Sequence, residues 1–237
     1  MNEIALVTGA SGGLGREITL RLLHEGVTVV AHHYKSDMGF INNIEGYGEK
    51  MLPMRADLRS KAAVLSMVEA IGEKFGYLNY IVNAAAISKD ALLVKCSEAD
   101  WDNVMALNLT APFLVVKAAL PLMIRADKGH VINISSAAGM RGARGQCAYS
   151  ASKAALVGLT HTLARELAHY GICVNTVTPG YMDTPMGRTN PEALNRAIDE
   201  SMLGSLASPA EAAGLVCFLL RTSRITGQIF CADSRPI

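Results

Sequence analysis

Ile4-Ala-Leu-Val-Thr-Gly-Ala-Ser-Gly-Gly-Leu-Gly15 is the stretch that decides the fold of this chain. Its first five residues form a short apolar run that predicts a buried strand, and an amphipathic helical pattern starts at Leu14. Glycines at positions 9, 13 and 15 allow a tight turn between the two, which lets backbone amides and a helix N-terminus face a pyrophosphate. Because the turn lies between a strand and a helix, the stretch favours nucleotide binding over an ordinary connecting turn.

The same strand-to-helix alternation continues along the chain, and most of the apolar runs are apolar on both faces. The predicted strands are Ile4–Thr8, Val27–Ala31, Met51–Met54, Leu78–Val82, His130–Ile134, Cys173–Val177 and Gln228–Cys231. The predicted helices are Leu14–Glu25, Lys61–Phe75, Asp100–Arg125, Tyr149–Tyr170 and Pro209–Arg221. This order predicts an α/β fold: a three-layer, Rossmann-like, doubly wound parallel sheet with helices on both faces.

The 237 residues show no internal repeat and no interdomain linker, so we expect a single domain over residues 1–237. Ser60 and Ser208-Pro209 are expected to cap the helices that follow them. The least regular stretch is Pro179–Ser205, which has three prolines and no clean periodicity. We expect it to leave the sheet as one long excursion.

The composition excludes several classes of protein. A net charge of +1 argues against an extended nucleic-acid surface. No uncharged apolar run of about 18 residues is present, so no membrane span is expected. The five cysteines are scattered without a C-x-x-C pair, which is typical of reduced thiols in a cytoplasm and gives no metal site. We therefore expect a cytoplasmic protein, and the N-terminal residues do not resemble a secretory signal.

Tyr149 and Lys153 are the residues that most directly suggest chemistry. Residues four apart on a helix lie on the same face. A lysine ammonium beside a phenol favours the phenolate and is expected to lower the pKa of Tyr149 from about 10 toward neutral pH. Such a group could serve as a general acid and base. The spacing alone is weak, because it also occurs on solvated helix faces.

The segment after the second predicted strand bears on the cofactor. A dinucleotide-binding fold often places an acid there to bind the adenosine ribose. In this chain His32, His33 and Lys35 stand in its place. A carboxylate would repel a 2′-phosphate, so its absence favours NADP(H) over NAD(H). The alternative is that these are solvated loop residues.

Four segments together resemble the short-chain dehydrogenase/reductase family in order and spacing. They are Thr8–Gly15, Asn83-Ala-Ala-Ala86, Asn133-Ile-Ser-Ser136 and Tyr149–Lys153. The resemblance extends from about Ile4 to Ile229. It is especially close to the 3-oxoacyl-[acyl-carrier-protein] reductases of fatty acid biosynthesis, through stretches such as Leu107-Asn-Leu-Thr110 and Val177–Thr184.

The resemblance implies roles for individual residues. Tyr149 would protonate the carbonyl oxygen of the substrate, and Ser136 would hydrogen-bond the same oxygen. Lys153 would lower the pKa of the phenol and bind the nicotinamide ribose, and Asn108 would hold a water relay leading to it. Besides Tyr149 and Lys153, the implied cofactor-binding residues are Gly9, Ser11, Gly12, Gly13, Leu14, Gly15, His33, Lys35, Asp57, Leu58, Asn83, Ala84, Ala85, Pro179, Gly180 and Thr184.

The implied activity is the reduction of a ketone to a secondary alcohol with NAD(P)H. The expected substrate is a 3-oxoacyl thioester, carried by acyl carrier protein or coenzyme A. The resemblance also implies a homo-oligomer, a tetramer or a dimer, in which residues 179–205 act as a substrate lid. Two alternatives stay open: an alcohol or steroid dehydrogenase that works in the oxidising direction, and a catalytically idle nucleotide-binding subunit. The chain departs from the family pattern at Gly12, in Asn83–Ala86 and in the C-terminal segment Ala232–Ile237.

Overall fold

The computed structural model of the protein describes residues 2–34 and 48–235. These residues form a seven-stranded, wholly parallel sheet in the order β3-β2-β1-β4-β5-β6-β7. The strands are β1 (Ile4–Thr8), β2 (Thr28–His33), β3 (Met51–Arg55), β4 (Tyr80–Asn83), β5 (Gly129–Ile134), β6 (Ile172–Pro179) and β7 (Ile229–Ala232). The predicted Rossmann-like α/β fold is confirmed. The direction of winding reverses between β1 and β4, the point at which such sheets bind ligands.

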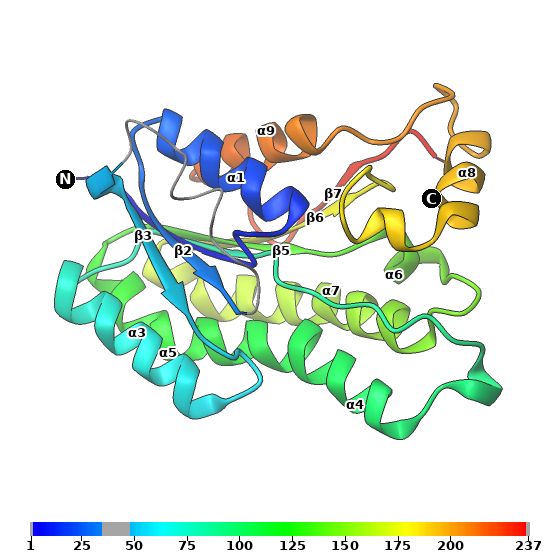
Figure 1. Ribbon diagram of the computed structural model, residues 1–237. Coiled ribbons are helices and arrows are strands. Elements are labelled where there is room, and N and C mark those ends of the chain that lie inside the picture. Colours follow the sequence, from blue (N-terminus) through cyan, green and yellow to red (C-terminus); the bar gives the residue numbers. More distant parts are fainter. Residues whose placement is uncertain (1, 35–47, 236–237) are drawn as a thin grey trace.

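Helices cover both faces of the sheet (Figure 1). One face carries α1 (Gly13–His24) and α9 (Pro209–Leu220), and the other carries α3 (Lys61–Phe75), α5 (Ala111–Arg125) and α7 (Cys147–Leu167). The shorter helical segments are η1 (Gly48–Lys50), η2 (Leu93–Lys95), α4 (Glu98–Met105), α6 (Ala137–Arg141), η4 (Ala168–Tyr170), η5 (Gly187–Thr189) and α8 (Pro191–Asp199).

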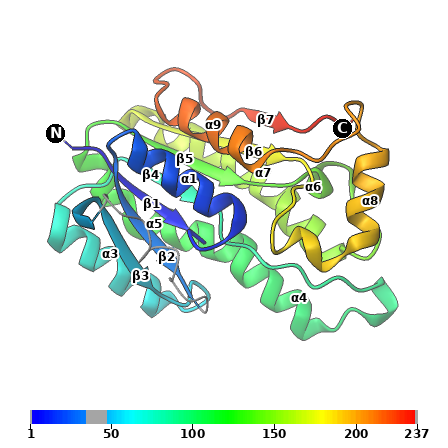
Figure 2. The same cartoon turned by 45° about the horizontal axis from the view of Figure 1, so that its top comes forward.

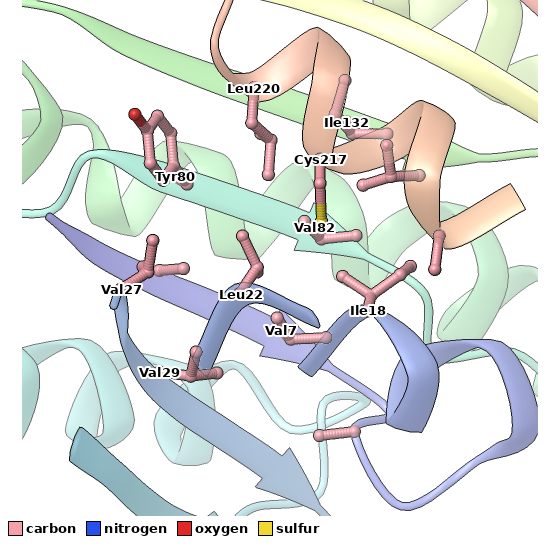
Figure 3. Packing of buried hydrophobic residues seen from close by; sticks show 14 of the residues in the cluster. Val7, Ile18, Leu22, Val27, Val29, Tyr80, Val82, Ile132, Cys217 and Leu220 are labelled. Carbon is pink, nitrogen blue, oxygen red and sulfur yellow. The ribbon is translucent and has the colours of Figure 1, made fainter. Parts of the chain in front are cut away.

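The alternation of side chains along each strand builds two separate cores. In β1, Val7 packs against α1 and α9, whereas Leu6 points to the opposite face and joins the core beneath α3 and α5. Figure 3 shows the first core, in which Ile18 and Leu22 of α1 meet Cys217 of α9 above the strands. Each such fully buried side chain contributes roughly 1.5–3 kcal/mol to folding. Both faces of the strands are therefore apolar, as the sequence predicts.

The predicted helix Asp100–Arg125 is in fact two helices joined by a π turn. The π turn η3 (Ala106–Thr110) lies between α4 and α5, and α4 begins at Glu98 because Ser97 caps it. This run, Glu98–Arg125, is long and apolar enough to cross a membrane by length and composition alone. In the described structure it packs against α3, α7 and the sheet, as a core helix of the fold does.

The excursion after β6 carries the short helix α8, which the sequence does not predict. The side chain of Asn190 caps α8 by accepting a hydrogen bond from the Ala193 amide at 3.0 Å. The two ends of the excursion are joined, because the Ala207 amide donates to the Tyr181 carbonyl at 2.9 Å. Figure 2 shows α6 and α8 side by side near the C-terminal end of the chain. They lie beyond the carboxyl ends of β5 and β6.

Candidate active site

The glycine turn between β1 and α1 is packed so closely that side chains are excluded. Gly9 has φ +66°, and an added Cβ would lie 2.8 Å from Ala85 Cα. At Gly15 an added Cβ would lie 2.2 Å from the Gly9 carbonyl oxygen. The Thr8 hydroxyl ties the turn to the end of β4 by accepting from the amides of Ala84 and Ala85, at 3.0 and 3.1 Å. The turn is thus a fixed surface of backbone atoms.

His32 supports the same turn through a side-chain hydrogen bond. Its Nδ1 accepts a hydrogen bond from the Gly9 amide at 3.1 Å, and its Nε2 lies 3.0 Å from the Ala56 carbonyl oxygen. This arrangement requires the neutral imidazole with its proton on Nε2. Burial lowers the pKa of His32 and keeps the ring neutral. The sequence places His32 near the nucleotide but gives no sign of this supporting contact.

A cavity of about 1130 Å³ opens at the carboxyl ends of the strands, beside the glycine turn. Most of the cofactor-binding residues expected from the sequence line it: Gly9, Ser11, Gly12, Gly13, Leu14, Gly15, His33, Asp57, Leu58, Ala84, Ala85, Tyr149, Lys153, Pro179, Gly180 and Thr184. Asn83 is expected there but is buried under the wall, where its side chain donates to Asn133 Oδ1 at 2.8 Å. Lys35 lies outside the described residues.

The end of the cavity near β2 and β3 has groups suited to an adenosine phosphate. Nδ1 of His33 is buried and has no hydrogen-bond partner among the described residues. Asp57 forms a bidentate pair with Arg59, at 2.9 and 2.7 Å, and this hydrogen-bonded cation lowers the pKa of Asp57 to about 2. Arg59 also lies over the Tyr34 ring, 5.5 Å from its centroid, and donates to Asn103 at 3.0 Å. The sequence analysis misses Arg59, although it follows Asp57 by two positions.

The other end of the cavity holds Tyr149, from the first turn of α7, and Ser136, which caps α6. The side chains of Tyr149 and Ser136 both line the cavity. Burial raises the pKa of Tyr149, and the nearby Ser136 hydroxyl partly offsets this rise. Ser136 accepts from the Ala138 amide at 3.2 Å, which fixes its hydroxyl. The two groups expected to share a carbonyl oxygen therefore line the same cavity.

The predicted lowering of the Tyr149 pKa by Lys153 is not what the structure shows. Nζ of Lys153 lies 5.7 Å from the Tyr149 ring centroid and donates to the Ile134 carbonyl at 2.7 Å. Burial lowers the pKa of Lys153 itself to about 8, so the side chain is still mostly charged at pH 7. Desolvation is the largest cause of the shift in both groups, so the pKa of Tyr149 is raised.

Asn108 lies in the π turn η3 and is fully buried, without a place on the cavity wall. Its side chain accepts from the Ile87 amide and donates to the Ile87 carbonyl, both at 2.9 Å, and it donates to Ser152 Oγ at 3.1 Å. Both amide hydrogens are thereby used within the protein. The side chain anchors the segment after β4 to α7, the helix that carries Tyr149.

Comparison with known proteins agrees with this geometry. The family model of the short chain dehydrogenases matches residues 3–195, and the chain belongs to that family. It is therefore an oxidoreductase that uses a nicotinamide nucleotide. The glycine turn, with no room for a Cβ at Gly9 or Gly15, and the cavity beside it fit that cofactor.

Several relatives match along nearly the whole chain. The chain is 37% identical to a 3-oxoacyl-[acyl-carrier-protein] reductase FabG of Thermotoga maritima, over 98% of this chain and 96% of the relative. It is also 37% identical to a 3-oxoacyl-[acyl-carrier-protein] reductase of Synechocystis, over 98% and 95% of the two chains. The corresponding FabG protein of Vibrio cholerae is 34% identical, over 95% and 93%. The resemblance noted in the sequence is confirmed.

Proposed function

We propose that this protein reduces a 3-oxoacyl thioester to the 3-hydroxyacyl thioester with NADPH. The observation that carries the proposal is the presence of Tyr149 and Ser136 together on the wall of one cavity, with the buried Lys153 on the same wall. The relatives named as 3-oxoacyl-[acyl-carrier-protein] reductases support this choice of substrate. We propose as carrier an acyl carrier protein or coenzyme A.

The site residues suggest a division of roles. The nicotinamide supplies the hydride. Tyr149 donates its phenol proton to the substrate oxygen, and Ser136 donates a hydrogen bond to that oxygen and so stabilises the charge developing on it. The buried ammonium of Lys153 lies 5.7 Å from the Tyr149 ring centroid and can bind the nicotinamide ribose. Asn108 acts as a positioning residue through Ile87 and Ser152, because its side chain has no amide hydrogen left for a water relay.

The preference for NADP(H) over NAD(H) is part of the proposal. Residues 29–35, at the end of β2, include no acid, and Asp57 on the cavity wall is paired with Arg59. The Arg59 guanidinium and the His33 ring, whose Nδ1 has no hydrogen-bond partner among the described residues, are two groups suited to a 2′-phosphate. Lys35 is proposed as a third donor on the charge argument alone.

We extend the proposal to the whole molecule. The protein is proposed to be a cytoplasmic homo-oligomer with a single domain, in which residues 179–205 close over the substrate. The excursion supports a lid role because Thr184, Met182 and Met186 from it line the cavity. An added Cβ at Gly13 would lie 2.4 Å from Thr184, so the excursion already touches the glycine turn.

Replacing Tyr149 with phenylalanine tests the proposal. The variant Tyr149→Phe should bind NADPH as the wild type does but lose turnover of acetoacetyl thioesters by about 10²–10⁴-fold, because the proton donor is gone. Turnover is measured by NADPH absorbance and binding by titration of NADPH fluorescence. Tyr170→Phe, at an exposed tyrosine just after the same helix, is the matched control. Retained turnover in Tyr149→Phe would overturn the assignment of the proton donor.

The same assays separate the alternatives. A dehydrogenase that works in the oxidising direction should turn over secondary alcohols with NAD⁺ or NADP⁺ faster than it reduces the thioester. An idle nucleotide-binding subunit should consume no NADPH with any member of a ketone panel. Consumption of NADPH with acetoacetyl thioester in preference to simple ketones supports the proposed function.

A further inference from the structure

Arg235, in the C-terminal segment after β7, places a buried cation on the wall of the cavity. Its side chain is only 9% exposed and is paired with Asp233, which is 3% exposed. Nη2 donates to Asp233 Oδ2 at 2.7 Å, and Nε donates to the same oxygen at 3.0 Å. Arg235 lines the cavity, whereas Asp233 does not. Asp233 therefore holds the guanidinium from the side away from the cavity.

The remaining nitrogen of this guanidinium, Nη1, carries N–H donors that Asp233 does not use. It forms an ion pair with Glu200, whose Oε2 lies 3.9 Å away, beyond hydrogen-bond distance. Among the described residues Nη1 makes no hydrogen bond. Glu200 is itself held by Arg141 at 2.8 Å and is 41% exposed, so it pairs closely with that other cation. This guanidinium has one edge held by Asp233 and a nitrogen, Nη1, that makes only a long ion pair, so it can bind an oxygen anion.

The surroundings of Arg235 are basic. Besides Asp57, Arg59 and Lys153, five cations line the cavity, against two acids on the wall and Asp233 behind it. The cations are Lys89, Arg141, Arg144, Arg196 and Arg235, and the acids on the wall are Asp90 and Glu200. A cleft with an excess of one charge concentrates ligands of the opposite charge.

Arg235 shares its cavity with the reacting groups. Arg235, Tyr181 and Tyr149 all line it. The hydroxyl of Tyr181 donates to the Gly187 carbonyl at 2.8 Å, which fixes this part of the wall. An anion on Arg235 can therefore belong to the same substrate whose ketone meets Tyr149.

We propose that Arg235 determines substrate specificity by binding an anionic oxygen of the substrate through Nη1. The anion is a carboxylate on the acyl chain or the phosphate of a pantetheine arm. The inference rests on the proposed function, because it assigns the substrate class of the same site. A purely structural role has its own support, since Ser234 next to Arg235 bonds Ser201 of the excursion at 2.6 Å. The test must separate the two roles.

Three 3-oxoacyl thioesters distinguish the anion-binding role of Arg235 from a structural one. The neutral one is acetoacetyl-N-acetylcysteamine, the second is acetoacetyl-phosphopantetheine, and the third is an N-acetylcysteamine thioester of 3-oxoadipate with a free terminal carboxylate. In Arg235→Gln, kcat/KM for the preferred anionic substrate should fall by about 10- to 100-fold more than kcat/KM for the neutral one. Arg235→Lys should restore part of this ratio, because it keeps the charge without the planar fork. The ratio within one variant does not depend on how much enzyme is folded.

Arg188→Gln is the matched control. Arg188 forms a similar bidentate pair with Asp183 in the same excursion, at 2.5 and 3.0 Å, but it is 66% exposed and lies off the cavity wall. Its three kcat/KM values should keep the ratios of the wild type. A second variant, Asp233→Asn/Arg235→Gln, removes both charges of the buried pair and should show the same loss of the ratio with less effect on folding.

The outcomes distinguish a phosphate ligand, a carboxylate ligand and a purely structural role for Arg235. A loss specific to phosphopantetheine identifies the phosphate, and a loss specific to the adipate derivative identifies the carboxylate. An equal loss for all three substrates makes the pair structural and overturns the proposal. If the wild type reduces none of the three, the proposed function fails. The assignment of Arg235 is then judged by calorimetry with phosphopantetheine and with adipate, and binding that Arg235→Gln leaves unchanged overturns it.

Discussion

Arg59 is the residue at which the cofactor preference can be tested most directly. Its guanidinium neutralises Asp57 and faces the cavity next to His33. In Arg59→Gln the Asp57 carboxylate loses its partner and faces any 2′-phosphate directly. We expect kcat/KM for NADPH to fall by about 10- to 100-fold relative to NADH, because a charge-assisted hydrogen bond is replaced by repulsion.

The control for this prediction is Arg55→Gln. Arg55 is an exposed arginine at the end of β3 that donates to the Tyr34 carbonyl at 3.1 Å, and it does not line the cavity. Steady-state rates with both cofactors give the ratio for each variant. An NADPH-to-NADH ratio that Arg59→Gln leaves at the wild-type value would contradict the role given to Arg59.

At the scale of single residues, the sequence predicts those groups whose partners are close in the chain or belong to a known pattern. Tyr149 and Lys153 are one helical turn apart, and both line the cavity. The contact of His32 with the Gly9 amide and the position of Arg235 on the wall depend on segments brought together only by folding. The predicted direction of the Tyr149 pKa shift was wrong, because the prediction considered the neighbouring cation and left out desolvation.

At the scale of elements, the glycine turn gives the sharpest prediction. Gly15→Ala would place a methyl group 2.2 Å from the Gly9 carbonyl oxygen, a backbone atom that can move only with the turn. We expect the free energy of unfolding to fall by about 1–3 kcal/mol. The affinity for NADPH should fall by at least about tenfold, since the displaced amides face the phosphates. Urea unfolding and NADPH titration measure the two effects.

Gly158→Ala is the counterpart in an ordinary helix. Gly158 lies in α7, and an added Cβ there would meet nothing within 4 Å. Its replacement should raise the free energy of unfolding by about 0.5–1 kcal/mol through helix propensity, with NADPH affinity unchanged. If Gly15→Ala behaved like Gly158→Ala, the turn would not be as closely packed as described.

The elements themselves were predictable wherever periodicity and end signals agree. The helix Lys61–Phe75 was predicted to the residue, because Ser60 caps it and Gly76 ends it in the left-handed conformation. The π turn was not predictable, because it depends on Asn108 reaching Ile87 and Ser152, which are distant in sequence. Helix α8 was not predicted, because it is only nine residues long and lies within a proline-rich stretch.

At the scale of the whole molecule, the sheet brings together pieces of the site that are far apart in the chain. The carboxyl ends of β1, β4, β5 and β6 lead into the glycine turn, the Ala84–Ile87 segment, Ser136 and the excursion, all on one cavity. The order of strands therefore determines which segments can meet. The alternation predicts a parallel sheet with right-handed crossovers, so these segments were expected at one edge of the sheet, and most of the predicted cofactor residues do line the cavity there.

The buried histidines make the stability of the whole molecule depend on pH. His130 is 1% exposed and accepts from the Asn175 amide at 2.8 Å, and burial lowers its pKa to about 4. The unfolded chain has a histidine pKa near 6.5, so it takes up a proton first as the pH falls. The stability contributed by neutral His130 is present above pH 6.5 and is lost between about pH 6.5 and 4. Its full size is about 3 kcal/mol, and His32 acts in the same direction.

Urea unfolding at intervals from pH 7 to pH 4 tests this dependence. The wild type should lose stability steadily as the pH falls, and His130→Gln should lose less over the same interval, since only His32 then contributes through a buried imidazole. His161→Gln, at an exposed histidine on α7, should follow the wild type. Asp57 does not affect the comparison, because its pKa of about 2 means that the stability contributed by its ionised form is lost mainly below pH 4. Parallel pH profiles for the wild type and His130→Gln would show that the buried imidazole is not the source of the acid sensitivity.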